Sequence, residues 1–306
     1  MANDFIQLSP VVAYLPGGAN IGLFDGPSGS VLIDSGNNKD SARRILKAVN
    51  SYGRSLSAVA LTHSNADHAG GAASLVERTG VPVYAQRMEA AFCVDPLLEP
   101  SFLWGGSPPA ELRGRFFMAP SCAVEALPEP DRALAGALLP SLPLALSQAG
   151  IRCLALPGHF FGQLGFMNDE VLFAGDAVFG PAIIDKHPIF FVYEVATFLE
   201  SLDRIASSGV RIVVPSHGEA TEDMGGLVAA NRRAIDRIAD SVLSACAAGQ
   251  SAEGALSLVS ENFGIELDWA QYALIGSTIR SFLVYLRSLG QIEAIFEGNH
   301  LIWRRV

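Results

Sequence analysis

Residues 62–71, THSNADHAGG, decide how the rest of this chain is interpreted. They place His63, Asp67 and His68 among small or polar residues that add little to a hydrophobic core. The run before them, SLSAVAL at 55–61, is typical of a β-strand. A turn that leaves a strand can direct residues 63, 65, 67 and 68 toward one centre, where imidazole and carboxylate suit Zn²⁺ or another divalent first-row ion. The stretch therefore predicts part of a metal site.

Three later stretches repeat this arrangement of an apolar strand followed by a glycine-containing turn. They are RCLALPGHFFGQLGFM, EVLFAGDAVF and VRIVVPSHGEA, and their turns carry His159, Asp176 and His217. A lone histidine on such a loop is usually a surface or packing residue, and Asp176 alone fits a turn or cap as well as a ligand. Four of the six histidines on strand-terminal loops, together with two aspartates in matching positions, favour one shared site.

The composition excludes several classes of protein. Half of the 306 residues are apolar and 30 are glycine, which indicates a buried core crossed by many tight turns and excludes a disordered chain. The formal net charge of −10 repels polyanions, so we expect no nucleic acid partner. The four cysteines are scattered without a CxxC pair, which disfavours a thiolate zinc site or a disulfide framework and points to a reducing compartment.

The sequence shows no membrane or secretion signal. Its first residues, MANDFIQLSP, lack the basic and apolar segments of a signal peptide. No apolar run reaches the ~18 residues of a membrane-spanning helix. We therefore expect a soluble, cytoplasmic protein without a membrane partner.

The order of elements predicts two sheets with helices outside them, because apolar strands repeatedly feed helices along residues 1–225. Residues 88–150 break the regularity with prolines and aromatic residues, and a connection of that length predicts an insertion or lid. From residue 226 the pattern changes to three helices and a closing hairpin that turns at Gly298 and Asn299. We therefore expect a small separate module over residues 226–306.

Five motifs in the first part resemble one known family. NIGLFDGPSGSVLIDSG, LTHSNADHAGG, LPGHFFGQLGF, LFAGDAVF and VVPSHGEA, in this order, resemble the metallo-β-lactamase-fold hydrolases over roughly residues 5 to 225. The tail SFLVYLRSLGQIEAIFEGNHLIWRR is similar to the small winged-helix module appended to some of them. The resemblance implies an α+β fold, a four-layer αββα sandwich with up to two metal ions at one edge of its sheets.

The resemblance also implies a ligand set. It places His63 and His159 at a first metal, Asp67, His68 and His217 at a second, and Asp176 between the two. The chain departs from the HxHxDH pattern at Asn65, which stands where a second histidine is expected. Because an amide oxygen is a neutral and weaker ligand than imidazole, the sequence predicts one tightly held ion and one that is loose or missing.

Two further residues near the motifs receive expected roles. Asp34, in LIDSG, is expected to orient the ligand loop from behind rather than to bind metal itself. Gln163 replaces a histidine that related chains often carry after PGH, and we expect this change to bear on the pocket rather than on the metal.

The chemistry implied by the resemblance is hydrolysis by a metal-activated water, with one or two zinc ions, or iron or manganese, as cofactor. Asp67 is the candidate that orients the water and accepts its proton. The predicted substrate is a small ester, thioester or lactone-like molecule. An iron-bound redox enzyme, or a non-catalytic scaffold that binds a ligand at the altered site, remains the alternative.

The aromatic residues of the 88–150 segment offer a hint about the substrate. They are Phe92, Phe102, Trp104, Phe116 and Phe117. They could line an apolar pocket beside the metal, or could simply pack the insertion onto the sandwich. The C-terminal module is expected to pack near the active-site edge or to pair two chains into a homodimer, since an acidic protein has little electrostatic reason to use it on DNA.

Overall fold

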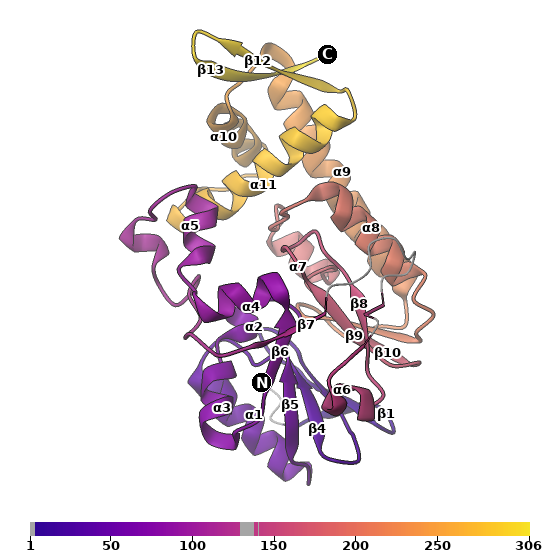
Figure 1. The fold of residues 1–306 in the computed structure, drawn as a ribbon. Coiled ribbons are helices and arrows are strands. Elements are labelled where there is room, and N and C mark those ends of the chain that lie inside the picture. Colours follow the sequence, from indigo (N-terminus) through magenta and orange to yellow (C-terminus); the bar gives the residue numbers. More distant parts are fainter. Residues whose placement is uncertain (1–3, 129–137, 140) are drawn as a thin grey trace.

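The computed structural model describes residues 4–128, 138–139 and 141–306. Its helices and strands follow one another along the chain as shown in Figure 1. They are β1 (Ile6–Ser9), β2 (Val12–Leu15), β3 (Ile21–Phe24), β4 (Ser30–Ile33), α1 (Lys39–Ser51), β5 (Leu56–Ala60), α2 (Ala66–Ala69), α3 (Ala72–Thr79), β6 (Val83–Gln86), α4 (Arg87–Val94), α5 (Leu98–Trp104), η1 (Ala110–Leu112), β7 (Glu125–Leu127), α6 (Leu144–Gln148), β8 (Arg152–Ala155), β9 (Leu164–Met167), β10 (Val171–Gly175), α7 (Pro181–Lys186), α8 (Val195–Ala206), β11 (Ile212–Pro215), α9 (Met224–Ala245), η2 (Cys246–Ala248), α10 (Ala252–Asn262), α11 (Trp269–Ser288), β12 (Ile292–Glu297) and β13 (His300–Arg305).

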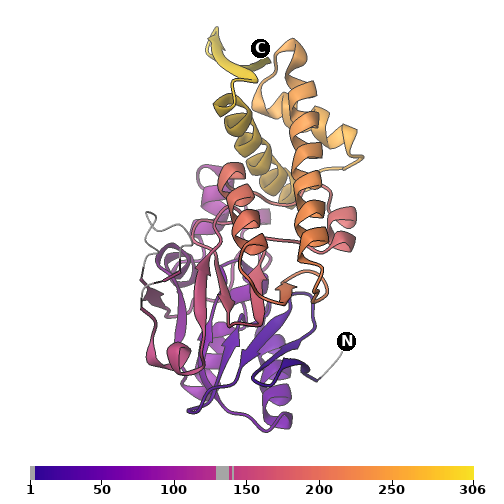
Figure 2. The same cartoon turned by 90° about the vertical axis from the view of Figure 1, so that its right-hand side faces the viewer.

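Two sheets form the body of the molecule. The larger has seven strands in the order of the chain, β1 to β7, and the smaller has four strands in the order β11-β10-β9-β8. Strands β1 to β4 pair antiparallel, β4 to β7 pair parallel, and the smaller sheet pairs parallel only between β10 and β11. The sheets lie face to face, with α1, α3 and α4 on one outer side and α7, α8 and α9 on the other (Figures 1 and 2).

The alternation of side chains along each strand explains why this arrangement has three cores. In β4, Val31 and Ile33 face the smaller sheet and pack in one cluster with Phe173. Leu32, between them, faces the opposite way and joins the cluster that holds Ile45 of α1. A third cluster lies between the smaller sheet and its helices. Because successive strand residues point to opposite faces, every central strand is buried on both sides. The predicted αββα sandwich is confirmed.

The described residues of the 88–150 segment divide between two places rather than forming one continuous lid. Within its described residues, α4 packs into the sandwich core through Ala90 and Cys93, and β7 extends the large sheet beside β6. By contrast, α5 and η1 reach toward α11 of the C-terminal part, where Leu103 and Leu112 pack against Ala273. Part of this segment therefore completes the sandwich, and part links it to the C-terminal helices.

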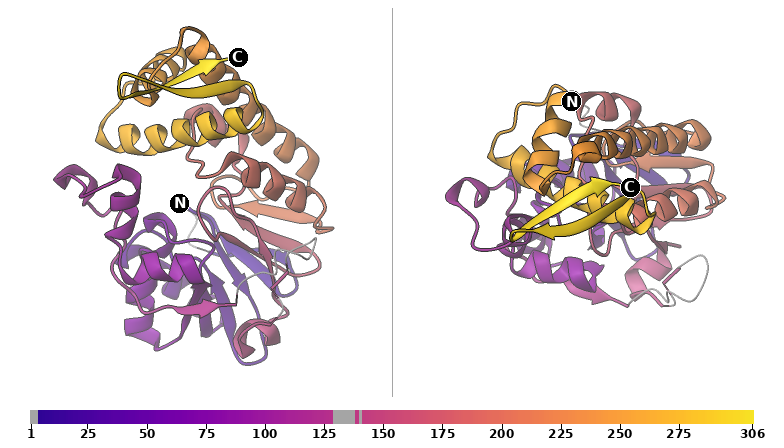
Figure 3. Two further views of the ribbon diagram at one scale, coloured as in Figure 1. Left: turned by 45° about the horizontal axis from the view of Figure 1, so that its top comes forward. Right: turned by 90° about the horizontal axis from the view of Figure 1, so that it is seen from above.

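The C-terminal part consists of three helices and the expected hairpin. Glu297 pairs with His300 across the turn, and Gly298 and Asn299 both have positive φ, as a type I′ hairpin turn requires. The long helix α9 runs from the sandwich into this part, and the hairpin lies across α11 at the far end (Figures 2 and 3). Helices α9 and α11 share one hydrophobic cluster with α8 and the smaller sheet. The helical module therefore packs on the sandwich, while its winged-helix resemblance stays a prediction.

In the residues that the structure describes, no helix has both the length and the apolar character that crossing a bilayer needs.

Candidate metal centre

The THSNADHAGG motif, residues 62–71, forms a tight loop between β5 and α3. His63 and His68 are buried, and α2 is a single turn that carries Asp67 and His68. The two glycines that follow allow the loop after β4 to come close. A Cβ atom on Gly70 would lie 2.4 Å from the backbone of Asn37, which no side chain could tolerate. The small residues of the motif therefore allow the two loops to pack against each other behind the histidines.

Three other strand ends bring the remaining candidates to the same place. His159 follows β8, Asp176 follows β10 directly, and His217 follows β11. Gly158 makes the turn before His159 with φ +123°, and a Cβ atom there would lie 2.3 Å from the backbone nitrogen of Phe198. The site therefore lies at one edge of both sheets, where the predicted ligand loops meet.

The structure gathers all six predicted ligands into two groups, and within each group the ligand atoms lie within 4.8 Å of one another. The first group is His63, His159 and Asp176, and the second group is Asp67, His68 and His217. Asp176 joins them, because its carboxylate oxygens lie 3.8 Å from His159 Nε2 and 3.6 Å from His68 Nε2. In the second group, His217 Nε2 lies 3.1 Å from Asp67 Oδ2.

Each of the four imidazoles is held through its Nδ1 atom by an oxygen atom of the protein. The pairs are His63 with Thr62 Oγ1 at 3.0 Å, His68 with Asp34 Oδ2 at 2.9 Å, His159 with the Phe191 carbonyl at 2.9 Å, and His217 with the Gly18 carbonyl at 2.6 Å. Since these oxygens can accept the Nδ1 hydrogen, the lone pair of each ring in its neutral form is on Nε2, the atom that faces the centre. Metal-binding histidines in proteins are oriented in this way.

Three of the converging atoms have no hydrogen-bond partner among the described residues. They are His63 Nε2, His68 Nε2 and Asp176 Oδ1, and all three are buried. A buried polar atom without a partner is costly, so such atoms require an explanation. A divalent cation bound between imidazole nitrogens and carboxylate oxygens supplies one, and the donor set fits it.

The first group provides neutral imidazoles. Burial and the adjacent ring of His68 lower the pKa of His63 well below its ordinary value. Burial likewise lowers the pKa of His159. Because a ligating imidazole must be deprotonated on the atom that binds, these two side chains are ready to bind a cation at neutral pH.

The second group has a strongly negative environment. Burial alone would lower the pKa of His68, but the carboxylates of Asp67, Asp176 and Asp34 outweigh it and raise the pKa to about 9. Burial is outweighed again at His217, where Asp176 and Asp67 raise the pKa to about 11. The same carboxylates that favour a proton on these rings would favour a divalent cation in its place.

Asp34 has the orienting role that the sequence predicts. Its carboxylate accepts hydrogen bonds from the Thr62 backbone N–H at 2.8 Å and from the Thr62 hydroxyl, as well as from His68 Nδ1. It is 1% exposed and adopts a left-handed backbone conformation with φ +64°, which a non-glycine residue adopts only when its surroundings demand it. The prediction is confirmed.

The expected role of Gln163 in the pocket is wrong. Its side chain is buried between strands and does not line the cavity beside the site. Its Oε1 accepts a hydrogen bond of 3.2 Å from the backbone N–H of Asp176, and its Nε2 donates to the Leu156 carbonyl. Gln163 therefore supports the loop that presents Asp176, a role that depends on the pairing of β8, β9 and β10.

Sequence reasoning missed two buried carboxylates. Glu89 of α4 accepts hydrogen bonds from the Ser64 backbone N–H and hydroxyl and from the Gly162 N–H, so it ties two ligand loops together. Glu99 of α5 accepts a hydrogen bond of 2.8 Å from Asn65 Nδ2. Burial raises the pKa of both glutamates, and that of Glu99 strongly. The signal available in the sequence was a single acidic residue within each of two apolar stretches, MEAAFCV and LLEPSFL.

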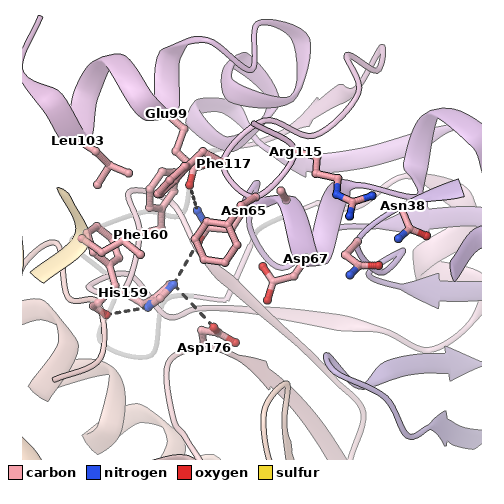
Figure 4. Close-up of a pocket in the computed structure, with 15 residues that line it drawn as sticks. Asn38, Asn65, Asp67, Glu99, Leu103, Arg115, Phe117, His159, Phe160 and Asp176 are labelled. Atoms are coloured by element: carbon pink, nitrogen blue, oxygen red, sulfur yellow. Dashed lines mark hydrogen bonds and ion pairs between the residues drawn. The ribbon is translucent and has the colours of Figure 1, made fainter. Parts of the chain in front are cut away.

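A cavity of about 410 Å³ opens onto both groups (Figure 4). Its polar wall includes Asn65, Asp67 and Asp176, and its apolar wall comes from the 88–150 segment, the loops of the smaller sheet and α11. The lining residues are Asn37, Asn38, Asn65, Ala66, Asp67, Glu99, Leu103, Arg115, Phe116, Phe117, His159, Phe160, Asp176, Phe191 and Leu274. The C-terminal helices therefore contribute to the site through Leu274.

The prediction about the five aromatic residues is only partly right. Phe116 and Phe117 line the cavity. Phe92 and Phe102 instead pack against Phe161, in an aromatic cluster beneath the cavity wall. Trp104 lies outside it, in a separate surface pocket with Trp269, Tyr272 and Leu267. Their positions depend on how α5 meets α11, which a local sequence pattern does not encode.

Comparisons with known proteins agree with this geometry. Residues 14–143 match the family model described as the metallo-beta-lactamase superfamily. The chain is 26% identical over 151 residues to a hydroxyacylglutathione hydrolase of Methylobacillus flagellatus, covering 49% of this chain and 44% of the relative. It is 25% identical over 197 residues to an atrochrysone carboxyl ACP thioesterase of Aspergillus fumigatus, covering 63% of this chain and 49% of the relative. The chain spans about half the length of the curated relatives it matches.

The fold is shared over a greater length with a solved structure. The crystal structure of a beta-lactamase domain protein from Burkholderia ambifaria covers 100% of this chain and 95% of its own, with a TM-score of 0.73 and 22% identity. That likeness includes the C-terminal helices as well as the sandwich. The relatives named above are hydrolases, so the family includes hydrolytic enzymes. Residues 14–143 therefore resemble the metallo-β-lactamase superfamily in sequence, and the chain as a whole shares the fold of the Burkholderia ambifaria protein.

Proposed function

We propose that this protein is a metal-dependent hydrolase of a small ester, thioester or lactone-like substrate. The observation that carries the proposal is the cavity of about 410 Å³, which has an apolar wall and opens directly onto the two groups of candidate ligands. A cavity of this volume suits a small molecule rather than a polymer. The two relatives that are hydrolases by name, one of them a thioesterase, support the same reaction class.

The residues divide the metal-binding task between the two groups. His63, His159 and Asp176 would hold a first ion, and the second group would hold another, with Asp176 shared. Zinc suits these nitrogen and oxygen donors, and iron or manganese could take its place. A bound divalent ion lowers the pKa of water toward ~7 and polarises the oxygen of a substrate carbonyl.

Asp67 is the candidate for the proton-handling role. Both Asp67 and Asp176 line the cavity, but the side chain of Asp67 is 46% exposed and that of Asp176 only 7%, so Asp67 is the more accessible carboxylate. Asp67 Oδ2 is held 3.1 Å from His217 Nε2, which fixes the direction of the carboxylate. A carboxylate so placed would orient a water molecule toward the substrate and accept its proton.

The cavity wall favours a substrate with an apolar acyl part and an acidic group. Leu103, Phe117 and Phe191 provide apolar surface at one side. Arg115 lines the same cavity and forms no hydrogen bond or ion pair with the residues that the structure describes (Figure 4). A guanidinium group without a counter-ion beside an apolar wall suits a carboxylate on the substrate.

The proposal is tested by assaying the purified chain after loading with zinc, iron or manganese. The panel contains short-chain and aryl esters, acyl thioesters, lactones, a β-lactam and a phosphodiester. We expect turnover of at least one ester, thioester or lactone, loss of turnover after chelation, and recovery when metal is returned. Metal-loaded protein that turns over nothing on the panel contradicts the proposal, and tight binding of a panel member without turnover would identify a scaffold instead.

A further inference from the structure

Asn65 occupies the position where the motif calls for a histidine, and its side chain is held from both ends. Its Nδ2 donates a hydrogen bond of 2.8 Å to Glu99 Oε1, and its Oδ1 lies 3.2 Å from His159 Nε2 (Figure 4). Glu99 comes from α5, which lies 34 residues further along the chain. The amide therefore stands between the buried carboxyl group of Glu99 and His159, a candidate ligand of the first group.

The contact with Glu99 decides which end of the amide faces the site. The oxygen and nitrogen of an asparagine side chain have nearly the same shape, so hydrogen-bond partners determine its orientation. The acceptor Oε1 of Glu99 takes the amide N–H, and this leaves Oδ1 on the side of His159. Glu99 is 5% exposed, so water does not compete freely for this contact.

An ordinary structural role does not account for the side chain of Asn65. The residue stands at the N-cap of α2, where asparagine usually accepts a hydrogen bond from a backbone N–H of the first turn. Here no hydrogen bond joins the side chain to the backbone of that turn. The amide oxygen lies toward His159 instead, so the Asn65 side chain contacts the candidate metal centre and does not cap the helix.

The position of the oxygen is compatible with that of a ligand. Two ligand atoms on one tetrahedral ion, each at about 2.0–2.2 Å from it, lie roughly 3.3–3.6 Å apart. Asn65 Oδ1 and His159 Nε2 are 3.2 Å apart, close to this range. His63 Nε2, in the same group, is buried and has no hydrogen-bond partner among the described residues. An oxygen donor at Asn65 would raise the first group from three ligands to four.

We propose that the amide oxygen of Asn65 is the fourth ligand of the first metal, and that Glu99 is the positioning residue that holds the amide in the binding orientation. The inference rests on the proposed metal-dependent function, because it concerns one of the two ions. It also gives the 88–150 segment a role in metal binding, since α5 supplies Glu99 and packs against α11.

The test measures zinc affinity at each site of the full-length chain by titration against a chromophoric chelator. Glu99→Met removes the acceptor at similar side-chain volume, and Glu99→Gln retains an oxygen that can accept the Asn65 N–H. We expect Glu99→Met to weaken the looser site about 10- to 100-fold, as loss of a residue that orients a ligand does, with the tighter site unchanged. Asn65→Ala is expected to weaken the looser site at least as much, and Glu99→Gln to recover most of the loss.

The double variant Asn65→Ala with Glu99→Met separates positioning from a general effect on the fold. If Glu99 acts through Asn65, adding Glu99→Met to Asn65→Ala causes no further loss of affinity at the looser site. A further loss, or a looser site unaffected by Asn65→Ala, contradicts the inference. Thermal unfolding of each apo-protein identifies a variant that fails to fold. If a Glu99→Met variant fails, the double variant Asn65→Ala with Glu99→Gln is compared with Asn65→Ala instead.

The result also distinguishes this inference from the proposed function. Wild-type protein that binds a single zinc ion at every zinc concentration contradicts the inference, although hydrolysis with one ion could still be observed. Wild-type protein that binds two ions with the expected dependence on Asn65 and Glu99, but hydrolyses nothing, would support the inference and contradict the proposed function.

Discussion

The two groups of the candidate metal centre share Asp176 but differ in charge and in access. The second group adds the carboxylate of Asp67, which is 46% exposed, to its two histidines. The first group has the neutral amide of Asn65 at the matching place, and its histidines are buried. Since charge and donor strength both favour the second group, we expect one strong and one weak site on the same scaffold. A single residue type at position 65 would then be enough to make a paired centre unequal.

The largest expected effect comes from Asp67, which we propose as both a metal ligand and the proton acceptor in the second group. Asp67→Ala should remove metal and activity together. Asp67→Asn should retain part of the metal and lower kcat about 10²- to 10⁴-fold, because an amide cannot accept the proton. Elemental analysis and kcat are measured on the same samples. An Asp67→Asn variant with the wild-type rate would show that Asp67 is not the catalytic residue of the proposal.

Removing one histidine from each group tests the comparison directly. His217→Ala should release the tightly held ion during dialysis and regain part of its activity in excess metal, because the other ligands remain. His159→Ala should keep that ion and lose only the weaker one. Metal content is measured after dialysis of both variants side by side. Equal losses of metal from the two variants would mean that the two groups bind metal equally well.

The number of metal ions retained by the wild type and by Asn65→His should then show how far the two groups differ in affinity. Protein dialysed against a mild chelator is expected to retain about one ion per chain, because a neutral amide oxygen binds more weakly than imidazole. Asn65→His should raise the retained metal toward about two ions per chain. Wild-type protein that retains two ions under the same dialysis contradicts the expected inequality.

The smallest expected effect concerns the cavity wall, which should act on both groups alike. Leu274→Ala removes apolar surface that α11 contributes to the cavity, so KM for an acyl substrate should rise roughly tenfold while metal content stays unchanged. Trp104→Ala is the matched control, since Trp104 lines a separate surface pocket rather than the cavity beside the candidate metal centre. A change in KM from Trp104→Ala, with none from Leu274→Ala, would place the substrate elsewhere.

Much of the fold could be predicted from the sequence because its signals are local. The short apolar runs of β4, β5 and β10 indicated buried strands, and the glycines near their ends indicated turns. The helical spacing after residue 226 and the Gly298–Asn299 turn likewise lie within short windows. These features depend on residues next to each other in the chain, and the structure confirms them.

The aromatic residues of the 88–150 segment show where this local reasoning stops. Phe117 lines the cavity while Trp104, on α5, does not, although both lie in the same irregular stretch. The difference arises from the contact of α5 and η1 with α11, elements separated by more than a hundred residues. Composition could indicate an apolar pocket but could not assign its walls.

The sequence by itself determined which residues could bind metal, because strand, turn and ligand type are written together in each motif. It also marked Asn65 as the departure from the pattern. The tertiary structure alone decided which groups the Asn65 side chain contacts, since Glu99 and His159 reach it from separate segments. It likewise placed Gln163 behind Asp176 rather than in the pocket. The physical reason is that a hydrogen bond depends on distance and direction in space, and residues far apart along the chain acquire these only when the chain has folded.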